Sequence, residues 1–194
     1  MATVLQEKLI SVDEYLHDEL VRDIKHELVD GAIYAMAGAS ANHERISGNV
    51  AAEFRSHLKK TPCESFSSDM KVKVGSRFFY PDVLVDCHFD ESRPYYTESP
   101  VIIVEVLSKS TRRMDETTKL MSYINIPSLQ EYVLIEQDFV DIEVVRRSKG
   151  WQPRHYFLGD QVNFESINLT LPVEEIYSRV KNEDMLAFLV QKND

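Results

Sequence analysis

The chain has 194 residues, 43% of them hydrophobic, which suits one compact domain with a substantial core. Its 32 acidic and 22 basic residues give a formal charge of −10, the wrong sign for binding nucleic acid through the overall field. Any nucleic-acid partner must therefore be bound through local contacts. No apolar run reaches the roughly 18–20 residues that span a bilayer, so we expect a cytoplasmic protein without a membrane segment.

Several common functional signatures are absent from the sequence. Cys63 and Cys87 have neither the paired Cys/His spacing of a zinc site nor the density of a secreted disulfide scaffold, so we expect reduced, packed thiols. The six glycines form no GxGxxG or GxxxxGK[ST] loop, and no GxSxG motif is present. These absences argue against the corresponding nucleotide-binding and hydrolase sites.

The first third of the chain is expected to form a helix, a hairpin and a long second helix. Ser11 and Glu14 form a capping box at the start of the first helix. The turn Asp30-Gly31, which requires positive φ, joins the two strands of the hairpin. Apolar residues at every fourth position give the second helix one buried stripe, namely Ile46, Val50, Phe54 and Leu58. The expected ranges are 12–20, 26–29 with 32–36, and 42–60.

The middle of the chain changes from helix to sheet. Residues 70–74 alternate apolar side chains with Lys71 and Lys73, a pattern typical of a strand with one solvent-facing side. Residues 82–87 and 101–107 form two nearly continuous apolar runs, and the second is typical of a central strand.

The remaining elements complete a mixed α/β architecture. A helix is expected over residues 114–126, with Leu120, Met121 and Ile124 facing inward and Pro127 ending it. Strands follow over 131–135 and 140–146, and then a terminal helix over 173–180 with a frayed acidic tail. We therefore predict one domain over 1–194, with a short N-terminal helix, a central mixed sheet flanked by helices, and a C-terminal helical tail.

Two carboxylates stand out from the apolar strands. Glu105 lies inside the run VIIVEVL, where an unpaired charge would cost several kcal/mol, so it requires a cationic partner or a water-filled site. If the two strands pair antiparallel with Cys87 opposite Pro100, Asp82 lies opposite Glu105. Adjacent carboxylates with a cation between them are the arrangement that Mg²⁺ uses. Taken alone, Glu105 fits a structural salt bridge as well as it fits a metal ligand.

A wider set of residues resembles a known family. The set comprises Glu27-Leu28-Val29-Asp30-Gly31, His43, Pro81-Asp82, Glu105-Val106-Leu107-Ser108, Ser110-Thr111-Arg112, Asp115, Lys119, Tyr123 and Glu131-Tyr132. In order and spacing it resembles the bacterial Uma-two family, endonucleases of the PD-(D/E)xK superfamily, over about residues 11–146. The resemblance implies a restriction-endonuclease-like fold, which agrees with the strand pattern.

The resemblance also implies a site and a reaction. Asp82 and Glu105 would hold Mg²⁺, or Mn²⁺ as a substitute, with the Val106 carbonyl as a further ligand. Leu107 stands where the superfamily usually has its lysine, and Lys119 on the next helix matches that role in this family. The expected reaction is hydrolysis of DNA, with a homodimer as a plausible assembly. The alternative is a catalytically inactive nuclease-like scaffold that binds DNA or protein.

Alternatives remain open for the supporting residues. Glu27 is either a third acidic group at the site or a solvent-facing hairpin side chain. His43 either orients a water or phosphate or simply begins its helix, and the second reading is slightly preferred. Lys119 either serves the site or forms an exposed ion pair with Asp115. Lys109 is expected to point into water. For Ser108, Ser110 and Thr111, helix capping is the favoured role. For Arg112 and Arg113, contacts with phosphate are a hypothesis. The aromatic residues are assigned no role in stacking on bases.

Overall fold

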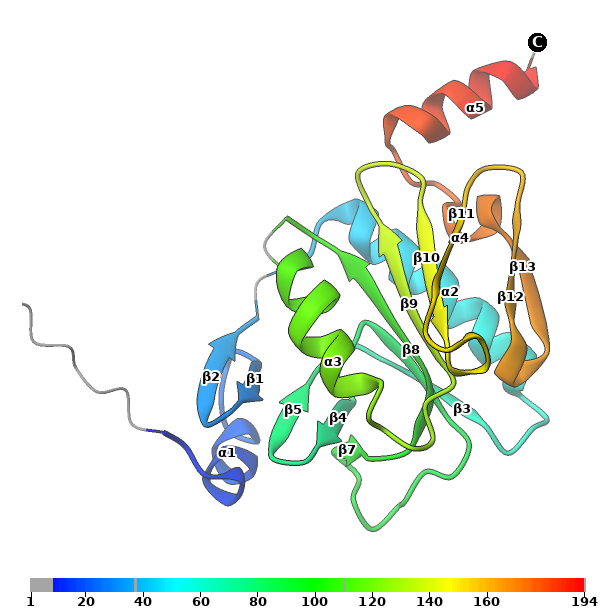
Figure 1. Ribbon diagram of the computed structural model, residues 1–194. Coiled ribbons are helices and arrows are strands. Elements are labelled where there is room, and N and C mark those ends of the chain that lie inside the picture. Colours follow the sequence, from blue (N-terminus) through cyan, green and yellow to red (C-terminus); the bar gives the residue numbers. More distant parts are fainter. Residues whose placement is uncertain (1–8, 37, 110, 194) are drawn as a thin grey trace, which may run out of the picture.

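The computed structural model describes residues 9–36, 38–109 and 111–193, and the prediction for Ser110 lies outside them. Within these ranges, helices cover a six-stranded mixed sheet, and a five-stranded sheet lies beside it (Figure 1). The mixed α+β class with helices flanking a central sheet is therefore confirmed.

The six-stranded sheet has the order β11-β10-β9-β8-β6-β3. Its strands are β3 (Glu64–Ser67), β6 (Val83–Asp86), β8 (Pro100–Leu107), β9 (Glu131–Glu136), β10 (Ile142–Arg146) and β11 (Pro153–Tyr156). Strand β8 is central, antiparallel to β6 and parallel to β9. The carboxyl ends of β8 and β9 therefore meet at the same edge of the sheet, which is where the candidate site lies.

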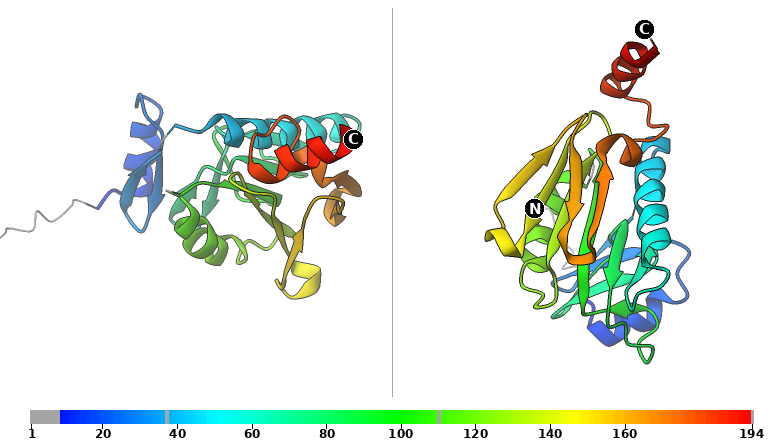
Figure 2. Two further views of the ribbon diagram at one scale, coloured as in Figure 1. Left: turned by 90° about the horizontal axis from the view of Figure 1, so that it is seen from above. Right: turned by 90° about the vertical axis from the view of Figure 1, so that its right-hand side faces the viewer.

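The two faces of this sheet pack against different layers. Val104 and Val106 belong to the core that contains the apolar stripe of α2 (Ala41–Leu58). Ile103 and Leu107 belong to a second core, beneath η1 (Met114–Lys119) and α3 (Leu120–Tyr123). Figure 2 shows α2 along one side of the sheet. Because side chains alternate along a strand, Glu105 faces the second layer with Ile103 and Leu107.

The five-stranded sheet supplies the wall beside this second layer. Its order is β2-β1-β5-β4-β7, with β1 (His26–Val29), β2 (Ala32–Ala35), β4 (Lys71–Val74), β5 (Arg77–Phe79) and β7 (Tyr96–Thr97). Helix α1 (Val12–Glu19) packs on it through Tyr15, whose ring lies 5.2 Å from that of Phe78. Ser11 caps α1, and Asp30 and Gly31 both have positive φ in the β1–β2 turn, as predicted.

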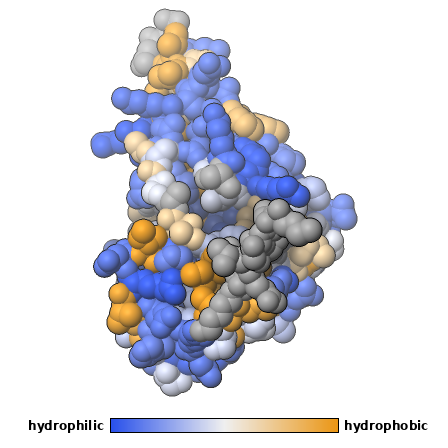
Figure 3. Space-filling model, turned by 90° about the vertical axis from the view of Figure 1, so that its left-hand side faces the viewer, coloured by the Kyte–Doolittle hydropathy of each residue, from blue (hydrophilic) through white to orange (hydrophobic). Residues whose placement is uncertain are grey.

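The C-terminal part contains more structure than the sequence pattern indicated. Strands β12 (Gln161–Phe164) and β13 (Leu169–Pro172) form a hairpin, followed by α4 (Val173–Ile176). The predicted frayed tail is wrong, because residues Glu183–Asn193 form α5. This helix projects from the body (Figure 1) and exposes Leu186, Leu189 and Val190. The top of the molecule, where this helix lies, shows apolar surface in orange in Figure 3. The division of the whole chain into one domain stays a prediction.

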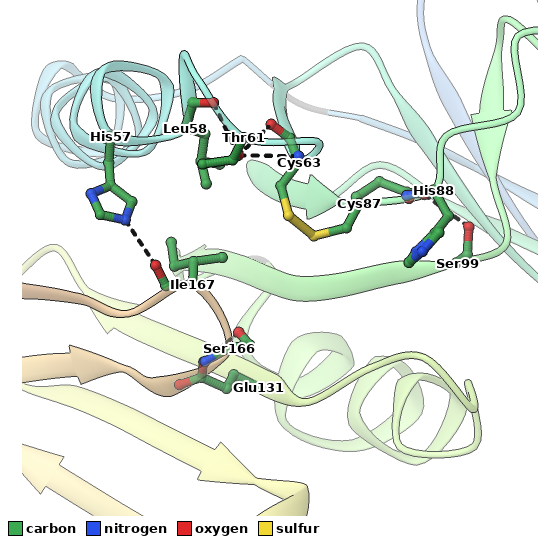
Figure 4. The surroundings of a disulfide bond; sticks show 11 residues. His57, Leu58, Thr61, Cys63, Cys87, His88, Ser99, Glu131, Ser166 and Ile167 are labelled. Atoms are coloured by element: carbon green, nitrogen blue, oxygen red, sulfur yellow. Dashed lines mark hydrogen bonds between the residues drawn. A yellow bond between two sulfur atoms is a disulfide. The ribbon is translucent and has the colours of Figure 1, made fainter.

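The expectation of two reduced thiols is wrong. Cys63 and Cys87 form a disulfide between the segments that flank β3 and β6 (Figure 4). The sequence of β3 gives only a weak strand signal, so no local pattern indicates that the two cysteines face each other. The register pairs Glu64 with Asp86, which places Cys63 and Cys87 opposite each other one residue further along.

Three other expectations need correction. Val83 pairs with Val104, which supports the predicted alignment of Asp82 with Glu105, but a bulge after Val85 leaves Asp86 rather than Cys87 opposite Pro100. Met121 does not face inward, since it is 61% exposed. Lys71 is buried rather than solvent-facing, because its ammonium packs against the Tyr80 hydroxyl at 3.2 Å.

Candidate functional site

The ends of β6 and β8 bring Asp82 and Glu105 together. The β6–β8 pairing begins at Val83 and Val104, so β8 extends beyond it and leaves the Val106 amide without a ladder partner from β6. Asp82 Oδ2 accepts a hydrogen bond from this amide at 2.7 Å. The carboxylate of Asp82 is thereby fixed beside the strand that carries Glu105.

Lys119 lies at the centre of a buried carboxylate cluster. Its Nζ is 3.0 Å from Glu27 Oε1, 3.1 Å from Glu105 Oε1 and 3.0 Å from Asp115 Oδ1. The residue is only 4% exposed, so the alternative of a solvent-exposed pair with Asp115 does not describe it. Glu27 is also buried and does not face solvent, as its alternative had supposed. The Tyr123 hydroxyl adds a hydrogen bond to Glu105 Oε1 at 3.2 Å.

The irregular geometry of the helix after β8 explains why polar side chains of this helix face the sheet. Residues Met114–Lys119 form a π-helix, in which the Leu120 amide donates to the carbonyl of Asp115 five residues earlier. Tyr132 on β9 supports this turn by donating to the same carbonyl at 3.0 Å. Asp115, Lys119 and Tyr123 are all buried on the side that faces β8. Isolated π-turns within helices frequently occur at functional sites.

Two further residues reach the site from neighbouring elements. His43, in the first turn of α2, places Nε2 3.3 Å from Asp82 Oδ2, so it lies at the site as well as beginning its helix. Gln137, just after β9, donates to the Leu107 carbonyl at 2.8 Å and accepts from the Ser40 hydroxyl that caps α2. Gln137 thus ties the end of β8 to the start of α2.

Burial and charge act in opposite directions on these groups. Burial raises the pKa of Glu105 well above its ordinary value, against the lowering influence of Lys119, and it also raises the pKa of Asp115. Burial alone would lower the pKa of Lys119, but the charges of Glu105, Glu27 and Asp115 outweigh it and raise that pKa. For His43, the contact with Asp82 likewise outweighs burial and raises the pKa. Lys119 is therefore held as a cation.

A cleft of about 600 Å³ opens onto these groups. Its lining includes Asp82, Glu105, Lys119 and His43, together with Tyr34 from the hairpin. Sequence reasoning did not single out Tyr34 or Gln137. A signal for Gln137 existed, because it directly follows β9 and the carboxyl ends of parallel strands meet at one sheet edge.

Some motif residues are not brought to the site. Glu131 lies at the opposite end of β9, where it pairs with Arg146 at 3.1 Å and accepts from the Ser166 amide. Arg112 forms a two-pronged ion pair with Glu136, which also raises the pKa of Arg112. Lys109 is exposed, as expected. Ser108 and Thr111, by contrast, line the cleft, and the Ser108 hydroxyl accepts from the Thr111 amide at 3.2 Å, which fits the predicted capping of this turn.

The fold and the carboxylate–lysine cleft define a nuclease-like protein of the restriction-endonuclease-like class. The chain belongs to the Uma2 family, described as "Putative restriction endonuclease", whose model matches residues 12–174. This membership confirms the predicted family and supports the nuclease class.

Similar proteins extend the comparison. The chain is 36% identical over 173 residues to "Uncharacterized protein slr1290" of Synechocystis sp., covering 87% of this chain and 91% of that protein. It is 36% identical over 142 residues to "Uncharacterized protein sll1609" of the same organism, covering 71% and 80%. A crystal structure of a "putative nuclease belonging to DUF820" from Anabaena variabilis matches with a TM-score of 0.76 at 18% identity, over 89% and 99% of the chains. At that identity the last match shows the shared fold.

Proposed function

We propose that this protein is a metal-dependent endonuclease that hydrolyses phosphodiester bonds of DNA. The observation that carries the proposal is the meeting of Asp82, Glu105 and Lys119 in one cleft at the ends of adjacent strands. The family supplies the nuclease class. The metal requirement, the DNA substrate and the residue roles are proposed here.

The residues present fit a divalent cation. Four carboxylates, those of Glu27, Asp82, Glu105 and Asp115, line the cleft around a single buried ammonium group. Glu27, Glu105 and Asp115 all share the one ammonium of Lys119, so the carboxylates outnumber the buried cation that faces them. Within the described ranges no three acidic, histidine or cysteine side chains form a ready metal cage. Mg²⁺ commonly uses only one or two carboxylates and fills its other positions with water and substrate phosphate.

In this mechanism Asp82 and Glu105 hold the ion, with the Val106 carbonyl as a further ligand. When bound, the ion supplies polarisation of the phosphodiester and a lower pKa for an attacking water. Lys119 stabilises the negative charge that develops on the phosphate oxygens. The Val106 amide fixes the Asp82 carboxylate, and Glu27 and Asp115 hold the lysine ammonium.

A second candidate is a nuclease-like scaffold that binds DNA or protein without cutting. The observation that favours it is that the Lys119 ammonium already lies between three carboxylates, as in a closed structural cluster. A nuclease should gain thermal stability from millimolar Mg²⁺ or Mn²⁺. A closed cluster should show no such gain.

Single-turnover cleavage of labelled DNA at saturating Mg²⁺ tests the proposal. Asp82→Asn should abolish cleavage and leave the fold intact, because the amide oxygen can still accept from the Val106 amide. Lys119→Met should lower the rate strongly without weakening metal binding, whereas the exposed Lys109→Met should have little effect. Glu53→Gln, on the exposed side of α2, is the matched carboxylate control. Normal cleavage by Asp82→Asn would contradict the proposed site.

Two broader assignments remain proposals. The first is a homodimer, which would allow two sites to cut the two strands of a duplex.

The second is the location of the protein. The helices described above lack the combination of length and apolar character that a bilayer crossing requires. A cytoplasmic location stays a prediction, and the Cys63–Cys87 disulfide departs from the reduced thiols expected there.

A further inference from the structure

We propose that the ring of Tyr34 is a platform for an unpaired nucleobase, so that the cleft takes DNA with an unpaired nucleotide at the reacting position. This inference rests on the proposed function, because it names the kind of DNA that the same site would accept. Tyr34 belongs to β2, the outer strand of the five-stranded sheet (Figure 1). It lines the cleft and is 45% exposed.

The register of the hairpin fixes where this ring stands. Tyr34 and Glu27 are directly opposite partners in the β1–β2 pair. Opposite residues carry their side chains on the same face of a sheet, with Cβ atoms about 4.5–5.5 Å apart. Glu27 Oε1 lies 3.0 Å from Lys119 Nζ, so Tyr34 stands one strand outward from the lysine cluster. A nucleotide whose phosphate reaches Asp82 and Glu105 could therefore extend its base towards Tyr34.

The charge of the cleft favours stacking as a source of affinity. The lining lysines are already engaged, since Lys119 contacts three carboxylates and Lys25 pairs with Asp69 and donates to the Ser68 carbonyl. The lining carboxylates outnumber them, namely Glu27, Glu44, Asp82, Glu105 and Asp115. Phosphate contacts are thus restricted, whereas every base has a face that can stack on an aromatic ring. The exposed ring of Tyr34 at the cleft therefore supplies binding affinity for a base that the charged residues do not supply for the phosphates.

The same geometry distinguishes paired from unpaired DNA. A base inside a duplex is stacked on its neighbours and paired, so its face is not open to a protein ring. An unpaired nucleotide presents that face, whether in a single strand, at a frayed end or at a branch. A cleft of about 600 Å³ with its ring beside the acidic site suits such a nucleotide better than an intact duplex.

The test measures binding separately from cleavage. Fluorescence anisotropy with a labelled single strand and its blunt duplex, both with Ca²⁺ in place of Mg²⁺ so that a cation is present at the carboxylates, compares wild type, Tyr34→Ala and Tyr34→Phe. We expect wild type to prefer the single strand, Tyr34→Ala to weaken that binding at least about fivefold, and Tyr34→Phe to retain it. The weakening should be the same factor at low and physiological salt, because stacking releases no counterions. Tyr95→Ala is the matched control, since Tyr95 is 55% exposed and is not among the cleft-lining residues.

The outcomes separate this inference from the proposed function. Equal single-strand binding by wild type and Tyr34→Ala, or a preference of wild type for duplex, overturns the platform. If wild type still cleaves DNA in that case, the nuclease proposal stands alone. If no cleavage occurs but binding depends on Tyr34, the platform stands and the nuclease proposal fails. Thermal unfolding of each variant checks that the fold is retained.

Discussion

Replacing Lys119 by methionine should destabilise the protein strongly in the absence of metal. Lys119 is almost fully buried, and its ammonium lies within 3.0–3.1 Å of Glu27, Glu105 and Asp115. Methionine fills a similar volume but removes the cation. Removing one partner of a buried ion pair typically costs about 3–5 kcal/mol, because the remaining charge is left uncompensated. For a chain of this size, that loss corresponds to a fall in Tm of about 6–20 °C.

The variant also separates a closed cluster from a metal site. If Asp82 and Glu105 bind a divalent ion, Mg²⁺ should restore part of the lost stability, since the ion supplies the missing positive charge. Thermal unfolding followed by circular dichroism, with EDTA or with Mg²⁺, measures both effects. Lys109→Met is the matched control, because this exposed lysine should change the free energy of unfolding by no more than about 0.5 kcal/mol. A Lys119→Met variant with wild-type Tm in EDTA would refute the described cluster.

The remaining predictions concern protons, the disulfide and salt. Burial raises the pKa of Glu105, and Mg²⁺ binds the ionised carboxylate, so the affinity for Mg²⁺ should rise with pH; calorimetric affinities that do not change with pH would contradict this. The Cys63–Cys87 bond closes a 24-residue separation, so its reduction should lower the free energy of unfolding, measured by urea titration, by about 3 kcal/mol. A thiol assay that finds both cysteines free in the untreated protein would contradict this. Arg113→Glu should flatten the dependence of DNA affinity on salt, and an unchanged slope would exclude Arg113 as a phosphate contact; Arg112 is unsuitable because its guanidinium holds Glu136.

Local patterns predicted the elements that frame the site. The Asp30-Gly31 turn fixed the hairpin, and with it the pairing of Glu27 with Tyr34. The apolar runs of β6 and β8 gave the register that aligns Asp82 with Glu105. These features depend on turn chemistry and strand alternation, which short segments of sequence encode directly.

Other features depend on tertiary context that no local pattern carries. The helix after β8 was expected to turn Met121 inward, yet it buries Asp115 and Lys119 because the layer beneath it contains Glu105 and Glu27. A hydrophobic pattern cannot identify an inward face that is polar. Strands as short as β5 and β7 have too few residues to show alternation. The disulfide depended on β3, whose sequence Glu-Ser-Phe-Ser gives only a weak strand signal.

Anomalous diffraction from crystals grown with Mn²⁺ tests the central claim most directly, because it locates the ion without relying on activity. Our account predicts a peak within coordination distance of the carboxylates of Asp82 and Glu105, with Lys119 beside it and not as a ligand. The Asp82→Asn variant should lose or weaken this peak under the same conditions. A cleft with no peak at saturating Mn²⁺, and with Lys119 still between the carboxylates, would contradict the metal-dependent mechanism and favour the structural cluster.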